Sequence, residues 1–258
     1  MTTSTQPPAR SVFRSPRFLL LLALLAVLTA AGVLGLDCSV AAIVRKQEPD
    51  WIHQLAVWIS LSGGIGIYPF TALVVFCWAW WGRPNRGLRR ACLWVLTAEA
   101  ATAVLARVLK IAFGRWRPDQ VLGGHFEFFV PFKSKCHSFP SGHTADAAAV
   151  AAVLWFVYPR WRPLYVAWVA LMALARVGAE QHFMADAATG AALGVLCALA
   201  VGRNLDAIVR WIERRLFLQL ITWTGMGVAI MLSLPLPHNS IGAAAPRDAV
   251  GTTPAGKG

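Results

Sequence analysis

The sequence is poor in charged residues, and poorest in acidic ones. Only 14% of its 258 residues are charged, with 12 Asp and Glu against 24 Lys and Arg, whereas 57% are hydrophobic. A water-soluble globular domain carries more charge than this. The composition therefore excludes that class and predicts an integral membrane protein.

Residues suited to binding a metal ion are scarce as well. The five cysteines show no metal-binding spacing, and the few carboxylates form no cluster along the sequence. Zinc, calcium and magnesium sites in proteins need such groups of ligands. We expect no metal and no other cofactor.

Long apolar runs are what the sequence has in abundance. Six of them approach the ~20 residues that a helix needs to cross the hydrocarbon core of a bilayer. They are Phe18–Leu36, Leu61–Trp81, Ala91–Phe113, His143–Tyr158, Pro163–Gly178 and Ala185–Val201. We predict an all-α fold, a polytopic transmembrane bundle of six core spans.

Two runs allow more than one interpretation. The run Phe18–Leu36 follows three arginines, as in a signal peptide, but it exceeds the usual core of about 7–15 residues and lacks a clear cleavage site. We favour an uncleaved anchor. A seventh run, Leu216–Leu236, has no charge but includes Gln219 and Pro235. We favour a seventh span there, with a re-entrant or interfacial segment as the alternative.

Basic residues divide unevenly between the two ends of the spans. If the N-terminus is cytoplasmic, thirteen of the 24 Lys and Arg fall on the cytoplasmic side, as the positive-inside rule requires. They are Arg10, Arg14, Arg17, Arg83, Arg86, Arg89, Arg90, Arg160, Arg162, Arg203, Arg210, Arg214 and Arg215. We expect a multi-pass protein of the bacterial inner membrane.

This topology predicts the domain organisation. Residues 1–17 form a cytoplasmic disordered tail, 18–202 the six-span core, 203–236 a basic cytoplasmic segment with the candidate seventh span, and 237–258 a second disordered tail. Cys38 and Cys136 both face the non-cytoplasmic side, where an oxidising compartment allows a disulfide. Their spacing leaves open whether a disulfide or two free thiols result.

A second basic cluster lies on the outer side, against the orientation rule. It includes Arg45, Lys46, Lys110, Arg115, Arg117, Lys133, Lys135 and Arg176. The cytoplasmic arginines are explained by topology and by contact with anionic lipid, so the outer cluster predicts an anionic ligand. Nucleic acid is the poorer interpretation, because no basic stretch lies on a soluble domain.

Three short polar stretches interrupt membrane-level sequence, where ionisable groups are costly and usually functional. The first, KIAFGRWRP, contains Lys110 and Arg117. If the helix persists, their separation is about two turns, which puts both cations on one side, where they suit phosphate oxygens. Taken alone, Lys110 snorkelling to the headgroups and Arg117 anchoring at the interface is the simpler interpretation.

The second stretch, PSGH, opens the fourth span. Ser141 is a good N-cap, Gly142 lets a ligand approach the backbone, and His143 falls in the first turn. A helix N-terminus with free amides binds anions. The alternative is a simple cap with His143 at the interface.

The third stretch, ARVGAEQHFMAD, joins the fifth and sixth spans and contains Arg176, His182 and Asp186. On a helix, residues four apart share a face, so Asp186 accepts a hydrogen bond from one nitrogen of His182 and leaves the other as a nucleophile. The alternative is a pair that only caps the sixth helix.

Together the stretches resemble the signature of the type-2 phosphatidic acid phosphatase superfamily, K-x6-RP, PSGH and SR-x5-H-x3-D. The resemblance extends from about Ala91 to Val201 and departs where Ala175 replaces the serine. We expect the loss of that hydroxyl to tune activity without abolishing it.

The resemblance implies a role for each matching residue. Phosphate would be bound by Lys110, Arg117, Arg176, Ser141 and the Gly142 amide, with His182 as nucleophile, Asp186 as its partner and His143 as general acid. The expected enzyme is a metal-independent histidine phosphatase, because three fixed cations offset the phosphate charge that Mg²⁺ neutralises in other phosphoryl transfers.

The expected function is hydrolysis of a lipid phosphomonoester or diphosphate at the outer membrane surface, with the site facing the periplasm. The family implies phosphatidylglycerophosphate, phosphatidate, undecaprenyl diphosphate or lipid A phosphate as substrate. The alternatives are transfer of the phosphoryl group to an acceptor lipid, and a non-catalytic lipid-binding or transport protein. The oligomeric state is not predicted.

Four further features have two interpretations each. The segment 121–139 is either a lid that dips into the bilayer or an ordinary interfacial loop. We take His125 and His137 as surface histidines and expect Glu99 to form a structural hydrogen bond to a neighbouring helix. Asp146 either raises the proton affinity of His143 or favours the helix dipole.

Overall fold

The computed structural model describes residues 12, 15–47, 49–63, 66–82, 85–212 and 214–215. Within these ranges no strand is present, and one isolated bridge joins Arg115 and Phe126. The predicted all-α fold is confirmed. The described residues up to Trp211 form one compact unit. The run Leu216–Leu236 and both predicted tails, except Val12 and 15–17, lie outside the described residues.

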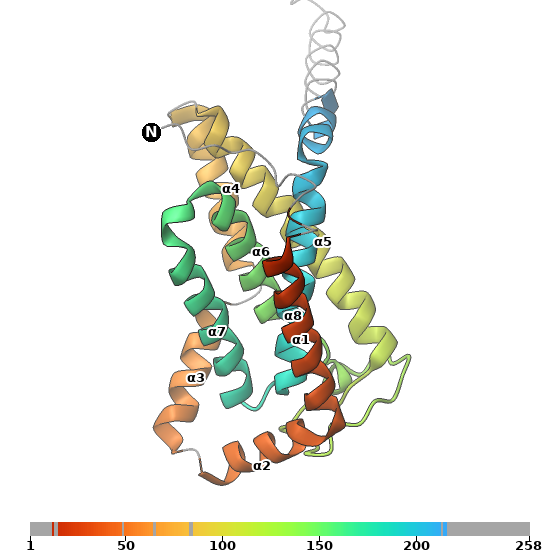
Figure 1. The fold of residues 1–258 in the computed structure, drawn as a ribbon. Helices are drawn as coiled ribbons and strands as arrows, with labels where there is room; N and C mark the ends of the chain where they lie inside the picture. The colour runs from red at the N-terminus through yellow and green to blue at the C-terminus, as the bar shows by residue number, and fades with distance from the viewer. Residues whose placement is uncertain are drawn as a thin grey trace, which may run out of the picture. The chain divides into compact units, whose positions relative to one another are not determined.

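The N-terminal part of this unit is helical, and the chain turns sharply between α1 and α2 (Figure 1). Its elements are α1 (Pro16–Ala31), the π-helical turn η2 (Gly32–Leu36), α2 (Asp37–Gln47), α3 (Asp50–Ser62), α4 (Ile67–Cys77) and the π-helical turn η3 (Trp78–Gly82). The first predicted span is therefore α1 with η2, and the second is mainly α4 with η3. Most of α3 precedes the predicted second span and was not predicted as a helix.

The signature-bearing part follows the predicted spans closely. Its elements are α5 (Arg86–Phe113), the short 3₁₀ turn η4 (Ser134–Cys136), α6 (Gly142–Val157), the 3₁₀ turn η5 (Pro159–Trp161), α7 (Arg162–Gly178) and α8 (Met184–Arg203). Asn85 caps α5 by accepting a hydrogen bond from the Leu88 amide. At the other end of α5, Gly114 is left-handed and ends the helix.

The apolar surface of the helices is that of a multi-pass membrane protein. Among the described residues, four helical stretches are long and apolar enough to cross a bilayer, namely Pro16–Lys46, Asp50–Gly82, Arg86–Phe113 and Met184–Arg203. The helix α6 is apolar but shorter. Large side chains such as Leu20, Leu34 and Leu174 are exposed on the outside, which is costly in water and favourable in lipid.

The core of the unit lies between α4, α5, α6 and α8. Trp94 is its largest buried side chain, and its indole N–H donates to the Ala198 carbonyl of α8 at 2.8 Å. Small residues let α6 and α8 approach closely: a Cβ on Gly190 would lie 2.4 Å from the Ser141 oxygen, and one on Gly194 would lie 2.0 Å from the Ala145 oxygen. This small-xxx-small spacing is typical of packed membrane helices, and it brings the second and third stretches side by side.

The disulfide that the topology allowed is not formed. Cys38 is an exposed free thiol and Cys136 a buried one. The Cys38 sulfur lies 3.7 Å from the Gly123 carbonyl oxygen, whereas the Cys136 sulfur lies 3.9 Å from a Glu127 carboxylate oxygen.

Candidate active site

The candidate catalytic residues lie at one end of the helix bundle, where α5 and α7 end and α6 and α8 begin (Figure 1). Lys110 is in the last turn of α5, and Arg176 is in the last turn of α7. His143 is in the first turn of α6 and Asp186 in the first turn of α8. Helix direction alone thus gathers residues that are up to 76 positions apart in the sequence.

A direct backbone contact joins the two helix starts. The Ser141 amide donates to the Asp186 carbonyl at 2.9 Å. This bond is made where Gly190 lets α8 touch the Ser141 carbonyl. The PSGH stretch and the start of α8 are therefore held in a fixed relation by main-chain atoms.

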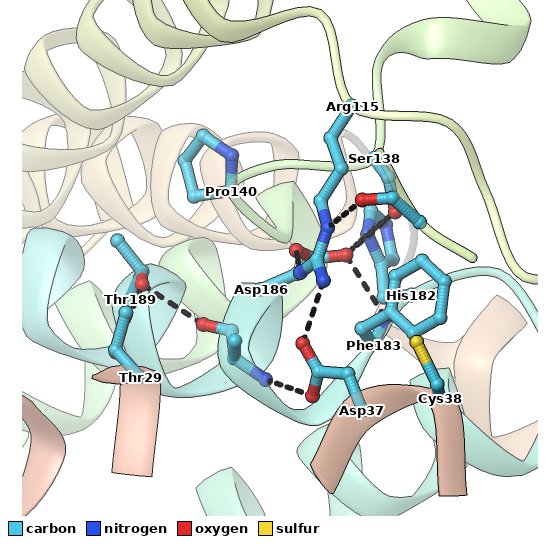
Figure 2. A network of polar contacts seen from close by, with 12 residues as sticks. Thr29, Asp37, Cys38, Arg115, Ser138, Pro140, His182, Phe183, Asp186 and Thr189 are labelled. Atoms are coloured by element: carbon cyan, nitrogen blue, oxygen red, sulfur yellow. Dashed lines mark hydrogen bonds and ion pairs between the residues drawn. The ribbon is translucent and has the colours of Figure 1, made fainter. Parts of the chain in front are cut away.

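His182 is not on a helix, which corrects the prediction of an i to i+4 helical pair. It lies in the turn before α8, and its Nδ1 is 3.7 Å from Asp186 Oδ2 and 3.4 Å from Ser138 Oγ. Figure 2 shows the ring beside these two groups. Asp186 Oδ2 also accepts from the Phe183 amide at 2.9 Å. The Asp186 carboxylate thus has both roles that the sequence left open: it caps α8, and it faces the His182 imidazole.

The surroundings of His182 keep its ring neutral. Burial, with 2% of the residue exposed, lowers the pKa of His182 to about 3, and the positive charges of Lys110 and Arg176 lower it further. The Asp186 carboxylate opposes this shift. A neutral ring whose Nδ1 faces Asp186 and Ser138 has Nε2 left as a lone-pair donor.

Lys110 and Arg117 do not share a helix face as predicted, because α5 ends at Phe113. Lys110 instead reaches the PSGH stretch, where its Nζ donates to the His137 and Pro140 carbonyls at 2.8 and 2.7 Å. Arg117 comes from the following loop and donates from Nη1 to Gln181 Oε1 at 2.6 Å, next to His182. Both cations therefore reach the same site by different routes.

Two guanidinium groups at this end of the bundle have unused donors. The Nε atoms of Arg117 and Arg176 are buried and lack a hydrogen-bond partner among the described residues. Arg176 donates from Nη1 to Ser60 of α3. A buried guanidinium N–H without an acceptor is costly, so these donors suit an anionic ligand that accepts their hydrogen bonds.

The start of α6 is the second source of donors. No acceptor is found among the described residues for the amides of Gly142, His143 and Thr144. Ser141 occupies the N-cap position, but its side chain makes no cap bond, contrary to expectation, and its Oγ instead pairs with Thr144 Oγ1 at 3.0 Å. A helix N-terminus of this kind binds anions.

His143 lies close to the positively charged residues of the site. Arg176, Lys110 and Arg117 all lie near enough to act electrostatically on its ring. In the described part of the chain no hydrogen bond is made to the ring, and neither a hydrogen bond nor an ion pair joins it to Asp146. The ring nitrogens of His143 are thus available to a bound molecule.

Three residues of the site were missed as site residues by the sequence analysis. Ser138 Oγ donates to Asp186 Oδ2 at 2.6 Å, and Arg115 donates to Asp186 Oδ1 at 2.6 Å. Asp37, from α2, accepts from Arg115 at 2.8 Å. Of these residues, only Arg115 had a signal in the sequence, its position in the outer basic cluster. Its contacts could not be predicted, because partners 71 and 78 residues away leave no periodic pattern.

The predictions for His125, His137 and Glu99 had different outcomes. His125 is exposed as expected, but His137 is buried and its Nε2 lies 2.7 Å from the Val130 carbonyl oxygen. Glu99 is buried, and its Oε1 has no partner among the described residues, so the expected hydrogen bond to a neighbouring helix is not found for that oxygen. In the segment 121–139, Phe126 packs on Phe113 and Phe139.

The outer part of that segment is apolar and exposed, as both interpretations of it require. Phe128, Phe129 and Phe132 are exposed, and Lys133 pairs with Glu127 at 3.2 Å. The amides of residues 128–130 donate to the last carbonyls of α5, and the Glu127 amide donates to the Gly114 carbonyl, which fixes this part of the loop on the helix end.

Comparison with known proteins places this geometry in context. A family model described as the PAP2 superfamily matches residues 91–233. A lipid A 1-phosphatase of Rhizobium etli is 32% identical over 103 residues, which are 39% of this chain and 44% of the relative. A second lipid A 1-phosphatase, of Rhizobium johnstonii, is 35% identical over 95 residues, which are 36% of this chain and 39% of the relative. The chain thus matches less than half the length of these curated relatives.

Two solved structures share the fold. A transmembrane PAP2 type phosphatidylglycerolphosphate phosphatase from Bacillus subtilis superposes with a TM-score of 0.55 at 21% identity, over 74% of this chain and 96% of that one. LpxE from Aquifex aeolicus superposes with a TM-score of 0.51 at 20% identity, over 64% of this chain and 94% of that one.

Proposed function

This chain belongs to the PAP2 superfamily, and on that premise we propose that it hydrolyses the phosphate ester or diphosphate of a membrane lipid through a phosphohistidine on His182. The observation that carries the proposal is the pairing of a buried, neutral His182 with unused donors on Arg117, Arg176 and the start of α6. The neutral imidazole of His182 suits a nucleophile, and the unused donors suit the phosphate that it attacks.

In the first step, the lone pair of His182 Nε2 attacks phosphorus in line with the leaving lipid oxygen. An N–P bond forms while the bond between phosphorus and that oxygen breaks, and His143 donates its proton to the departing oxygen. Lys110, Arg117 and Arg176 offset the negative charge on the three other phosphate oxygens. Asp186 stabilises the positive charge that develops on the imidazole.

In the second step, water attacks the phosphorus of the phosphohistidine. His143, now neutral, takes a proton from this water, the N–P bond breaks, and His182 is regenerated as inorganic phosphate leaves. Each proton given in the first step is recovered in the second, so the residues return to their starting state.

We include the membrane topology and the domain boundaries in the same proposal. The N-terminus lies in the cytoplasm of a bacterium, residues 18–202 form the catalytic core in the inner membrane, and the site opens to the periplasm. Its support is the basic content of the cytoplasmic loops. The substrate is then a lipid phosphate of the outer leaflet, and the names of the curated relatives put lipid A 1-phosphate first among the candidates to be assayed.

Release of inorganic phosphate in mixed micelles tests the proposal. The panel contains phosphatidate, phosphatidylglycerophosphate, undecaprenyl diphosphate and lipid A with its 1-phosphate. We expect turnover of at least one lipid by the wild type, and a loss of more than about 10³-fold in His182→Ala. His125→Ala, which changes an exposed histidine, is the matched control and should keep wild-type turnover. Equal phosphate release by a folded His182→Ala protein would overturn the proposal.

The same assay separates the alternatives. With a labelled phosphate on the lipid, hydrolysis puts the label in inorganic phosphate, whereas phosphotransfer puts it on a second lipid. Binding of a lipid phosphate without any loss of its label would identify a non-catalytic lipid-binding protein.

A further inference from the structure

Arg115 is a buried cation whose hydrogen bonds all go to protein atoms. Its Nε donates to the Gly124 carbonyl at 2.9 Å, Nη1 to Asp186 Oδ1 at 2.6 Å, and Nη2 to Asp37 Oδ2 at 2.8 Å. Only 2% of the residue is exposed. Unlike Arg117 and Arg176, this guanidinium has no unused Nε donor for a ligand, so it does not belong to the phosphate-binding group.

Two aromatic rings hold the plane of the Arg115 guanidinium, in addition to the hydrogen bonds at its edges. Arg115 lies over the ring of Phe183 at 4.3 Å and over the ring of Phe126 at 5.1 Å. Stacking on aromatic faces suits Arg in a desolvated place. A side chain held on its edges and by two aromatic rings presents Nη1 to Asp186 in one position only.

Asp37 connects this arrangement to a part of the chain outside the family match, which begins at residue 91. It is the first residue of α2, and its side chain is 1% exposed. Its Oδ1 accepts from the Ala185 amide at 3.0 Å while its Oδ2 accepts from Arg115 (Figure 2). Asp37 and Asp186 therefore both satisfy amides at the start of α8, and Arg115 bridges them.

The conformation of the N-terminal helices places Asp37 beside Arg115 and the start of α8. Gly35 has φ of 146°, which few other residues adopt, and it breaks the helix two residues before Asp37. Thr29 of α1 lies 3.0 Å from Thr189 of α8, between their hydroxyl oxygens. The helix ahead of the kink is thus tied to the same helix whose start Asp37 contacts.

A second contact of α2 lies about two turns further along the helix. Arg45 donates from Nε to Glu180 at 2.8 Å and from Nη2 to the Pro118 carbonyl at 2.6 Å. Glu180 is two residues before His182, and Pro118 follows Arg117. Helix α2 therefore contacts both the stretch that carries Arg117 and the stretch that carries His182.

We propose that Asp37 and Arg115 are positioning residues for the reaction: Arg115 sets the place of Asp186 beside His182, and Asp37 holds Arg115 by drawing its guanidinium toward α2. The inference rests on the proposed function, because the carboxylate so placed is the partner of the proposed nucleophile. The N-terminal helices α1 and α2 are then part of the active site, although neither touches the phosphate.

Removal of the Asp37 charge has a defined consequence. Arg115 would be left with a single carboxylate, so its full attraction would fall on Asp186. Asp186 would shift toward Arg115 and away from His182 Nδ1, which is already 3.7 Å from Oδ2. A displacement of this size affects the chemical step, which depends on the orientation of the imidazole, more than it affects phosphate binding by Lys110, Arg117 and Arg176.

The test compares Asp37→Asn with wild type in purified full-length protein. For whichever lipid phosphate the wild type turns over, we expect kcat to fall about 10- to 100-fold. The inhibition constant of inorganic phosphate, which reports on the cationic site alone, should stay within about threefold. Cys38→Ser, a change at the next residue of α2, is the control and should keep both values. So should Asp206→Asn, three residues beyond the end of α8, where Asp206 pairs with Arg90.

Two results would overturn the proposal. One is an Asp37→Asn protein with kcat within twofold of wild type, and the other is a fall in kcat matched by an equal weakening of phosphate inhibition, which indicates general disruption. Neither result touches the proposed function, which depends on the His182→Ala comparison. Loss of activity in His182→Ala with a normal Asp37→Asn protein would reject the positioning role alone.

A second variant decides the matter if Asp37→Asn does not fold, since this change leaves the Ala185 amide and Arg115 without their ionised acceptor on α2. The double variant Asp37→Asn with Arg115→Gln removes the Asp37 charge together with the cation that it holds, while the Asp186 carboxylate keeps its hydrogen bonds from Ser138 and the Phe183 amide. We expect it to bind inorganic phosphate normally and to turn over slowly, because Asp186 has lost the cation that places it. Wild-type kcat in the double variant would overturn the proposal.

Discussion

At the residue scale, the environment of His182 makes a prediction about stability. Its folded pKa of about 3 is below the ordinary value of about 6.5, so the unfolded chain binds more protons between these values. The stability contributed by neutral His182 is therefore fully present above about pH 6.5 and is lost as the pH falls toward 3.

We expect His182→Gln to weaken this pH dependence. Glutamine has no proton to gain in this range, so its variant should lose ~2 kcal/mol less unfolding free energy than the wild type between pH 7.5 and 4.5. The measurement is the unfolding of both proteins in detergent across this range. His125→Gln, at an exposed histidine, should behave as wild type. Identical pH profiles for wild type and His182→Gln would contradict the buried, neutral state of His182.

Single residues also mark the limit of what the sequence predicts. Lys110, Arg117, His143, Arg176, His182 and Asp186 were each identified from short spacings in the sequence. Asp37, Arg115 and Ser138 were not, because their contacts are made between loops and helix ends from different parts of the chain. Such contacts depend on where a chain turns, which spacing along one element does not encode.

At the element scale, the close approach of α6 and α8 sets the geometry of the site. Gly190 and Gly194 lie against backbone atoms of Ser141 and Ala145, and the Ser141 amide bonds to the Asp186 carbonyl. No larger residue fits at these two glycines unless the helices separate. The site therefore depends on small residues that take no part in the chemistry.

The variant Gly194→Val should force the two helices apart. Its Cβ would overlap the Ala145 oxygen, and overpacking of this kind costs about 1–3 kcal/mol. We expect a lower melting temperature together with a large loss of kcat, both measured in the same detergent preparation. Ala200→Val, on the exposed side of α8, is the matched control. Unchanged stability and activity in Gly194→Val would show that this contact is not needed.

Apolar runs predicted the elements well wherever a run filled a whole helix. The runs Ala91–Phe113 and Ala185–Val201 correspond to α5 and α8 within a few residues. Helix α3 was missed because Asp50, His53 and Gln54 dilute its apolar content. The helix expected to continue from Lys110 to Arg117 ends early, because Gly114 adopts a left-handed conformation.

At the scale of the whole molecule, the orientation in the membrane is the open prediction. The charged residues and histidines of the signature lie at the same end of the compact unit as the N-terminal helix α2. If that end faces the periplasm, Cys38 is accessible from outside the inner membrane, since it is the exposed cysteine among the five.

A charged maleimide that does not cross membranes should therefore label Cys38 in spheroplasts. The reaction is followed by the mass shift of the purified protein, and Cys38→Ser should remain unlabelled under the same conditions. The other cysteines are partly or fully buried and serve as internal controls. Labelling in inverted vesicles but not in spheroplasts would place the site in the cytoplasm.

The central claim is a covalent bond between His182 and the phosphoryl group of a lipid. Rapid quenching in alkali after mixing the enzyme with a lipid carrying labelled phosphate tests it most directly, because phosphohistidine survives alkali and is lost in acid. We predict a label on the protein that is stable in alkali, labile in acid and absent from His182→Ala. Label on the folded His182→Ala protein, or wild-type turnover by that variant, would contradict it.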